Sequence, residues 1–165
     1  MPSLYYVSVT AHLLAAFLWL GGMFFLAVVG APVLRSVQPA ALRADLFRQL
    51  GERFRTVGWA AIATLVVTGT INLHYRGLLS PTLWKSSDFW SLPLGRALAW
   101  KMGAVAAMLL FSAVHDFITG PAASRHEPGR ADADRARRQA AWLARLNAVV
   151  GLVVVIAAVR LARGG

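Results

Sequence analysis

Seven polar or ionisable side chains lie inside long apolar stretches of this sequence, and they are its chemically most informative residues. They are His12, His74, Lys101, His115, Asp116, Arg145 and Asn147. An ionisable group is costly in a membrane interior, and such groups usually face the inside of a helix bundle, an ion path or a cofactor. We therefore take these side chains as candidates for a functional site.

The two histidines His12 and His74 predict a haem site. A neutral imidazole is a strong ligand for haem iron, and a porphyrin that is not covalently attached needs an apolar pocket. The two haem propionates prefer cationic partners, which Arg76, Arg96 and Lys101 would supply. We therefore expect haem b with His12 and His74 as its axial ligands, provided that the two rings lie at the same depth.

Two axial imidazoles leave no open position on the iron, which favours electron transfer. The preferred function is a membrane b-type cytochrome that passes electrons between a quinone or another membrane donor and an acceptor on the outer side. Enzyme activity as a haem-dependent oxidoreductase is left open, and no catalytic residue is assigned. The expected partners are the lipid bilayer, a quinone or redox protein, and either a second copy or a larger membrane complex.

Several other interpretations stay open. Copper is the alternative metal, because thioethers are soft ligands for Cu(I); the donors would be His12, His74, Met23, Met102 and Met108. His115 is a further candidate metal ligand, or it forms a proton-handling pair with Asp116, or it ends a helix at the headgroups. His74 alone is equally consistent with an interfacial residue. A small accessory subunit without a cofactor is the structural alternative.

The elements that must position these residues are membrane helices. The chain has 165 residues, of which 58% are hydrophobic and 15% charged, where soluble domains carry about 25% charged residues. It contains no cysteine, which excludes disulfides, thiolate zinc sites and covalent haem attachment. Four segments are long enough to span a bilayer as helices: about 4–33, 57–79, 96–119 and 140–161. The sequence thus predicts a single all-α domain, a membrane four-helix bundle.

The basic residues predict the orientation of the bundle. The first loop carries Arg35, Arg43, Arg48, Arg53 and Arg55, and the third carries Arg125, Arg130, Arg135, Arg137 and Arg138. The opposite side carries Arg76, Lys85, Arg96, Arg160 and Arg163. Because cytoplasmic loops are enriched in Lys and Arg, we expect both termini outside a bacterial inner membrane. The net charge of +10 then reflects topology, and nucleic acid is not an expected partner.

The first loop has a helical pattern of its own. After Pro39, the apolar residues recur at helical spacing while arginines occupy the other face; the apolar set is Leu42, Leu46, Phe47, Leu50 and Phe54. This pattern is typical of an amphipathic helix in the headgroup layer. We expect a short interfacial helix at about 39–55. The third loop, residues 121–136, is polar and rich in small residues.

Four stretches together resemble two related membrane families. They are AHLLAAFLWLGGMFFLAVVGAPVL, VTGTINLHYRG, SLPLGRALAWKMG and RLNAVVGLVVV. Their order resembles copper-resistance D (CopD)-like proteins and is similar to HemJ-type protoporphyrinogen oxidases. Both resemblances imply a four-helix membrane bundle. The CopD resemblance implies copper handling, and the HemJ resemblance implies b-haem binding and porphyrin oxidation, with His12 as the haem ligand and Lys101 as the functional lysine.

Overall fold

The computed structural model describes residues 2–119 and 131–164, which form helices and no strand. The first long helix comprises α1 (Pro2–Phe25), a π-helical segment (Leu26–Gly30) and α2 (Ala31–Arg35). It is followed by α3 (Ala40–Tyr75) and by two short helices, α4 (Pro81–Lys85) and α5 (Ser87–Ser91). The last two long helices are α6 (Pro93–Val114), which continues as a π-helical segment (His115–Thr119), and α8 (Ala131–Ala162).

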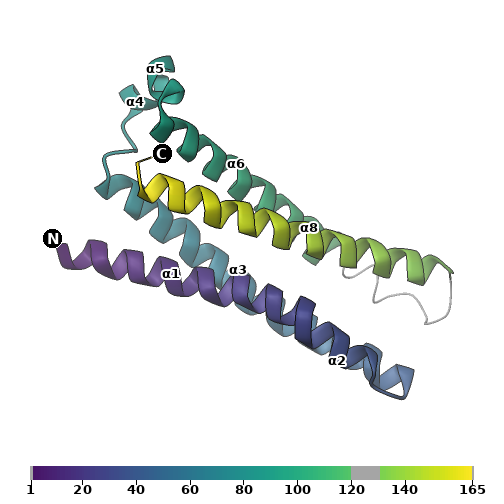
Figure 1. Ribbon diagram of the computed structural model, residues 1–165. Coiled ribbons are helices and arrows are strands. Elements are labelled where there is room, and N and C mark those ends of the chain that lie inside the picture. The colour runs from purple at the N-terminus through teal and green to yellow at the C-terminus, as the bar shows by residue number, and fades with distance from the viewer. Residues whose placement is uncertain (1, 120–130, 165) are drawn as a thin grey trace.

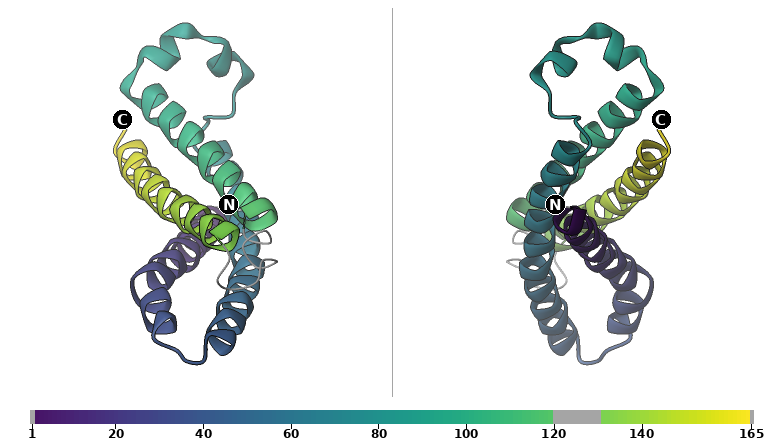
Figure 2. Two further views of the ribbon diagram at one scale, coloured as in Figure 1. Left: turned by 90° about the vertical axis from the view of Figure 1, so that its right-hand side faces the viewer. Right: turned by 90° about the vertical axis from the view of Figure 1, so that its left-hand side faces the viewer.

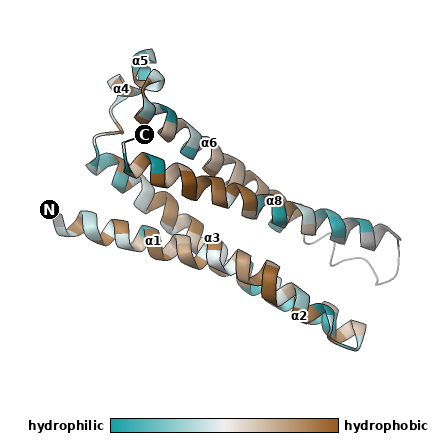
Figure 3. Cartoon of the chain, in the orientation of Figure 1, coloured by the Kyte–Doolittle hydropathy of each residue, from teal (hydrophilic) through white to brown (hydrophobic). Residues whose placement is uncertain are grey.

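Four helices among the described residues are long and apolar enough to cross a membrane. They are Ser3–Arg35, Ala40–Tyr75, Pro93–Thr119 and Ala141–Ala162. These spans are rich in apolar residues, as Figure 3 shows for the middle of α8. Large side chains such as Phe17 (73% exposed) and Val28 (68% exposed) point away from the core, as expected for residues that face lipid. The predicted all-α fold with four membrane helices is confirmed.

The structure places the helices in two antiparallel pairs. α1 packs along α3, α6 packs along α8, and the pairs meet mainly where α1 contacts α8 (Figures 1 and 2). Trp19 of α1 fills the centre together with Ala15, Ala61, Ile62 and Met108. A Cβ atom on Gly151 of α8 would lie 2.6 Å from Cδ1 of Leu20. The absence of a side chain at Gly151 therefore lets α8 approach α1.

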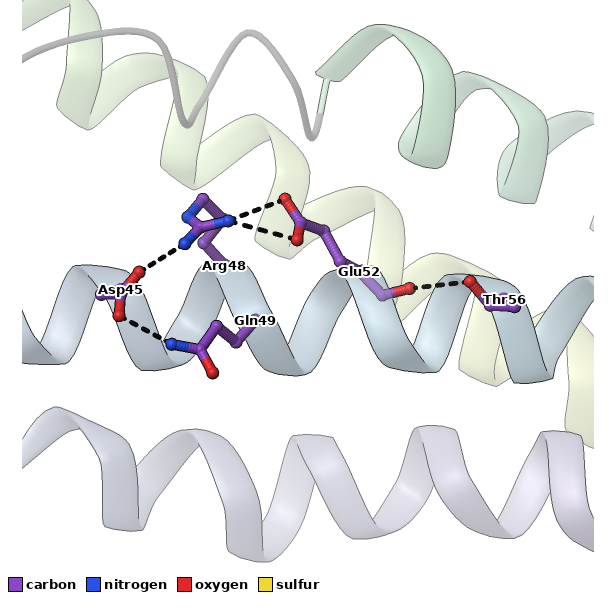
Figure 4. Close-up of polar contacts among 5 residues, drawn as sticks. All are labelled: Asp45, Arg48, Gln49, Glu52 and Thr56. Carbon is purple, nitrogen blue, oxygen red and sulfur yellow. Dashed lines mark hydrogen bonds and ion pairs between the residues drawn. The ribbon is translucent and has the colours of Figure 1, made fainter.

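The residues expected to form a separate interfacial helix at about 39–55 instead form the first half of α3. The first helix covers part of their apolar face: a Cβ atom on Gly22 would overlap the ring of Phe54, and one on Gly30 would lie 4.0 Å from Cδ2 of Leu50. Leu42 and Phe47 of the same face are exposed. The polar face is bridged along the helix by side chains one turn apart, as Figure 4 shows. Arg48 binds Asp45 (2.6 Å) and Glu52 (3.2 Å). The helix continues without a break from these residues into the apolar half of α3.

Three other boundaries differ from the expected ones. The first span ends at Arg35, beyond the expected 33. It contains a π-helical segment shortly before Pro32, which lacks the N–H that would bind the carbonyl four residues earlier. α3 ends at Tyr75, before the expected 79. α8 begins at Ala131, because polar residues extend the helix beyond the apolar segment. Of the predicted third loop, residues 121–130 lie outside the described residues, and residues 131–136 belong to α8.

A cap covers one end of the helices, the end where both termini lie (Figure 1). α4 and α5 form this cap with the buried side chains of Leu78 and Phe89, which pack against Leu98 of α6 and Leu161 of α8. The guanidinium of Arg76 donates to the carbonyl oxygen of Leu161 at 2.8 Å. A cation at the last carbonyls of a helix is favourable because of the helix dipole. This bond links the end of α3 to the end of α8.

Candidate functional site

His12 lies between α1 and α3 and is held by a hydroxyl group. Its Nδ1 atom is 2.8 Å from Oγ1 of Thr68, and the ring packs against the backbone of Gly69, where a Cβ atom would lie 3.3 Å from Cε1. Ser8, one turn earlier in α1, donates to the carbonyl oxygen of Thr68 at 3.3 Å. The histidine ring is half-buried and has a defined position.

The bonds of Thr68 indicate which ring nitrogen of His12 carries the proton. The Thr68 hydroxyl donates to the carbonyl oxygen of Thr64 at 2.6 Å, and with its single proton used there its oxygen accepts from His12. The ring therefore carries its proton on Nδ1, a tautomer that is assigned from the network. In a neutral imidazole the other nitrogen, Nε2, then has a free lone pair. A second bond that fixes the ring in this way is typical of metal-ligating histidines.

The structure does not bring His74 to His12. Thr68 and Gly69 of α3 face His12, and His74 follows Gly69 by five residues, which turns it about 140° around the helix and moves it about 7.5 Å along the axis. His74 is exposed, and its ring contacts the neighbouring Tyr75 at a centroid distance of 5.9 Å. The two imidazoles therefore do not face a common point.

The three cations predicted to accompany a haem have different surroundings. Lys101 of α6 is half-buried and close enough to His12 for the two groups to interact electrostatically. Arg76 interacts with Lys101 in the same way, although one of its nitrogens is bound to Leu161. Arg96 is exposed and lines a groove on α6 and α8. Lys101 thus places a positive charge near His12, and Arg76 places a second one near Lys101.

A second polar cluster lies at the other end of the helices. His115 Nδ1 is 2.8 Å from Oδ1 of Asp116, and Trp59 Nε1 donates to Oδ2 of Asp116 at 2.9 Å. The guanidinium of Arg55 donates to the backbone oxygen of Asp116 at 3.4 Å. The predicted pairing of His115 with Asp116 is present. Both carboxylate oxygens are engaged, so the cluster ties α3 to the segment after α6.

A third polar group lies in the core between α1, α6 and α8. Asn147 is buried, and its Nδ2 atom donates to Oγ of Ser112 at 2.8 Å and approaches Sδ of Met23 at 3.8 Å. Its Oδ1 atom is buried without a hydrogen-bond partner. Met108, one turn before Ser112, is buried in the same core, whereas Met102 is 40% exposed. Of the candidate thioethers, Met23 and Met108 are therefore the interior ones. Arg145 is exposed.

Sequence reasoning missed the partners of the candidate residues. Thr68, Trp59 and Ser112 each bind a candidate side chain but are common residues of membrane helices. Ser8 in turn binds the carbonyl oxygen of Thr68. One signal was available for Thr68: it belongs to a stripe of small residues on α3 with Gly58, Ala61 and Gly69. Such a stripe marks the face on which another helix packs, and His74 lies off it. Within the described residues, no cluster of three or more His, Asp or Glu side chains could hold a metal ion.

Most of the chain matches a known protein family. The family described as copper resistance protein D (CopD) matches residues 48–161, a stretch that runs from α3 to α8 and includes Thr68, Lys101 and Asn147. An uncharacterized protein of Aquifex aeolicus (strain VF5) is 28% identical over 155 residues, which cover 93% of this chain and 92% of the relative. No solved structure matches.

Proposed function

The chain belongs to the copper resistance protein D family, and we propose that it binds Cu(I) within the membrane and passes it on. The Nε2 atom of His12 would be the ligand that receives the ion. The observation that carries this proposal is the hydrogen bond between His12 and Thr68, because it positions the ring and, with the proton on Nδ1, leaves the lone pair of Nε2 for a metal. Copper is here the substrate of the protein.

The other donors near the core suit the same metal. Imidazole nitrogen and thioether sulfur are both ligands of Cu(I). Met23 follows His12 by eleven residues, so it lies on nearly the same face of α1, about 16 Å further along. Its sulfur lies 3.8 Å from the amide nitrogen Nδ2 of Asn147. A soft donor thus follows the imidazole along one helix face.

The surroundings of His12 favour a role in the transfer of Cu(I) over a role in its storage. The described residues offer no closed set of ligands around this ring, and the charge of Lys101 opposes a bound cation. A protein that moves an ion must bind it weakly enough to release it. We therefore expect reversible binding of Cu(I) at His12.

Haem b is the competing ligand. A site built from both His12 and His74 does not fit, because His74 lies on a different side of α3 from Thr68 and Gly69, which face His12. The observation that favours haem is a pair of cations, Lys101 near His12 and Arg76 near Lys101, since cations suit propionates. Bound haem would supply one-electron transfer. A red preparation with reduced cytochrome bands would decide for haem, and copper without porphyrin absorbance would decide for the metal ion.

The hydroxyl of Thr68 provides the test of the proposal. In Thr68→Val the acceptor for Nδ1 is lost, and we expect the affinity for Cu(I) to fall about 10- to 100-fold, as for other partners of ligating histidines. Affinity is measured by competition with a Cu(I) chelator on purified protein in detergent. Thr68→Ser should retain the wild-type affinity, because it keeps the oxygen.

Thr64→Val is the matched control for this experiment. Thr64 is exposed on the same helix, and its hydroxyl donates only to the carbonyl oxygen of Ala60. We expect this variant to bind Cu(I) like the wild type. Equal affinities for Thr68→Val and Thr64→Val, or no Cu(I) binding by the wild type, would contradict the proposal.

A further inference from the structure

A groove of about 500 Å³ follows the surface of α6 and α8 below the cap. Small residues of α6 form its floor, two valines of α8 form its other wall, and Trp90 closes its upper end. The lining comprises Trp90, Arg96, Ala99, Trp100, Gly103, Ala104, Ala107, Val150 and Val153. Except for Arg96 and the two tryptophans, every lining side chain is a small apolar one. The groove is therefore suited to an apolar chain.

The groove has a cation at one end, and its length along α6 is close to the thickness of one leaflet of a bilayer. Arg96 lies in the first turn of α6, is exposed, and makes no side-chain hydrogen bond or ion pair with any residue that the structure describes. From Arg96 to Ala107 the helix rises about 16 Å, close to half of the roughly 30 Å hydrocarbon core of a bilayer. The groove thus runs from the headgroup level to the middle of the membrane.

The two tryptophans mark the level of the interface. Trp90 is fixed, because its indole N–H donates to the carbonyl oxygen of Trp84 at 3.0 Å and its ring packs against Phe89 at a centroid distance of 5.0 Å. Trp100 is 70% exposed and lies one turn below Arg96 on the same face. Indole rings are enriched where headgroups meet acyl chains. The order of Arg96, Trp100 and the small residues follows the order of phosphate, glycerol and acyl chain in a phospholipid.

We propose that this groove binds an anionic phospholipid, with the phosphate on Arg96 and an acyl chain along Ala99, Gly103 and Ala107. Charge complementarity selects the headgroup, because the unpaired guanidinium has donors that fit phosphate oxygens. The beginning of α6 adds the positive end of the helix dipole. This site does not depend on copper binding, since neither His12 nor Thr68 takes part in it.

The test compares lipid binding by delipidated protein in detergent. Native mass spectrometry and thermal stabilisation are measured with phosphatidylglycerol, phosphatidylcholine and inorganic phosphate. We expect phosphatidylglycerol to bind more tightly than phosphatidylcholine, and Arg96→Gln to lower its affinity about fivefold, the effect of one basic residue at a membrane surface. Arg163→Gln is the matched control, an exposed arginine at the same end of the structure. We expect it to leave binding unchanged.

A second variant tests the groove itself. A Cβ atom on Gly103 meets nothing within 4 Å, so Gly103→Leu should fold normally while its side chain occupies the groove. We expect it to weaken the binding of both phospholipids. Equal effects of Arg96→Gln and Arg163→Gln, equal affinity for the two phospholipids, stabilisation by inorganic phosphate alone, or undiminished binding by Gly103→Leu would each overturn the proposal.

Discussion

His12→Ala is expected to abolish Cu(I) binding, with a fall in affinity of more than about 100-fold, larger than the loss caused by removing a partner of the ligand. The variant removes the nitrogen atom that the structure leaves free for a metal. Its fold should persist, because the Thr68 hydroxyl still donates to Thr64 and the half-buried ring leaves no unpaired donor behind. Chelator competition gives the affinity, and thermal unfolding of the same samples checks the fold.

His74→Ala is the control, because it removes an imidazole that is exposed on another side of α3. We expect wild-type Cu(I) affinity in this variant. A comparable loss in His74→Ala and His12→Ala would instead place both rings at one metal, as the sequence alone suggested. Retained affinity in His12→Ala would exclude this histidine as the ligand.

Gly95→Ala is expected to have the largest effect on stability. A Cβ atom at this position would overlap the carbonyl oxygen of Phe89, and it would lie 2.8 Å from the carbonyl carbon of Phe89 and 3.0 Å from Cα of Trp90. These are backbone atoms of α5 and cannot rotate away. Overpacking of this kind costs about 1–3 kcal/mol and occasionally more. We expect a lower midpoint of thermal unfolding in detergent, followed by tryptophan fluorescence.

Gly103→Ala is the matched control on the same helix. Its added methyl group meets open space, and exchanging glycine for alanine inside a helix is usually favourable by about 0.5–1 kcal/mol. The two substitutions should therefore shift the unfolding midpoint in opposite directions. If Gly95→Ala is as stable as Gly103→Ala, the cap does not pack against α6 as described.

Local sequence patterns predicted the helices well because membrane helices depend on length and apolarity. The four spans follow from runs of apolar residues, and their presence is confirmed. The surroundings of residues 39–55 were harder to predict from the sequence. Their apolar face is evident from spacing alone, but the pattern does not say whether lipid or another helix covers it. In the structure, α1 and the π-helical segment after it cover Phe54 and Leu50, whereas Leu42 and Phe47 stay exposed.

For the candidate site too, the sequence identified the unusual residues but not the packing around them. The sequence selected His12, Lys101, Asp116 and Asn147 as unusual membrane residues, and each lies in a polar environment in the structure. It did not give the rotation of α3 about its own axis, and this rotation separates His74 from His12. It also did not identify Thr68, since a threonine in a membrane helix commonly binds its own backbone and gives no sign of a partner on another helix.

The most direct test of the central claim is X-ray absorption at the copper edge of Cu(I)-loaded protein. Binding at Nε2 of His12 predicts the multiple scattering of an imidazole ring in the wild-type spectrum and its loss in His12→Ala. A spectrum that lacks imidazole scattering, or one that is identical in the two proteins, would contradict the account.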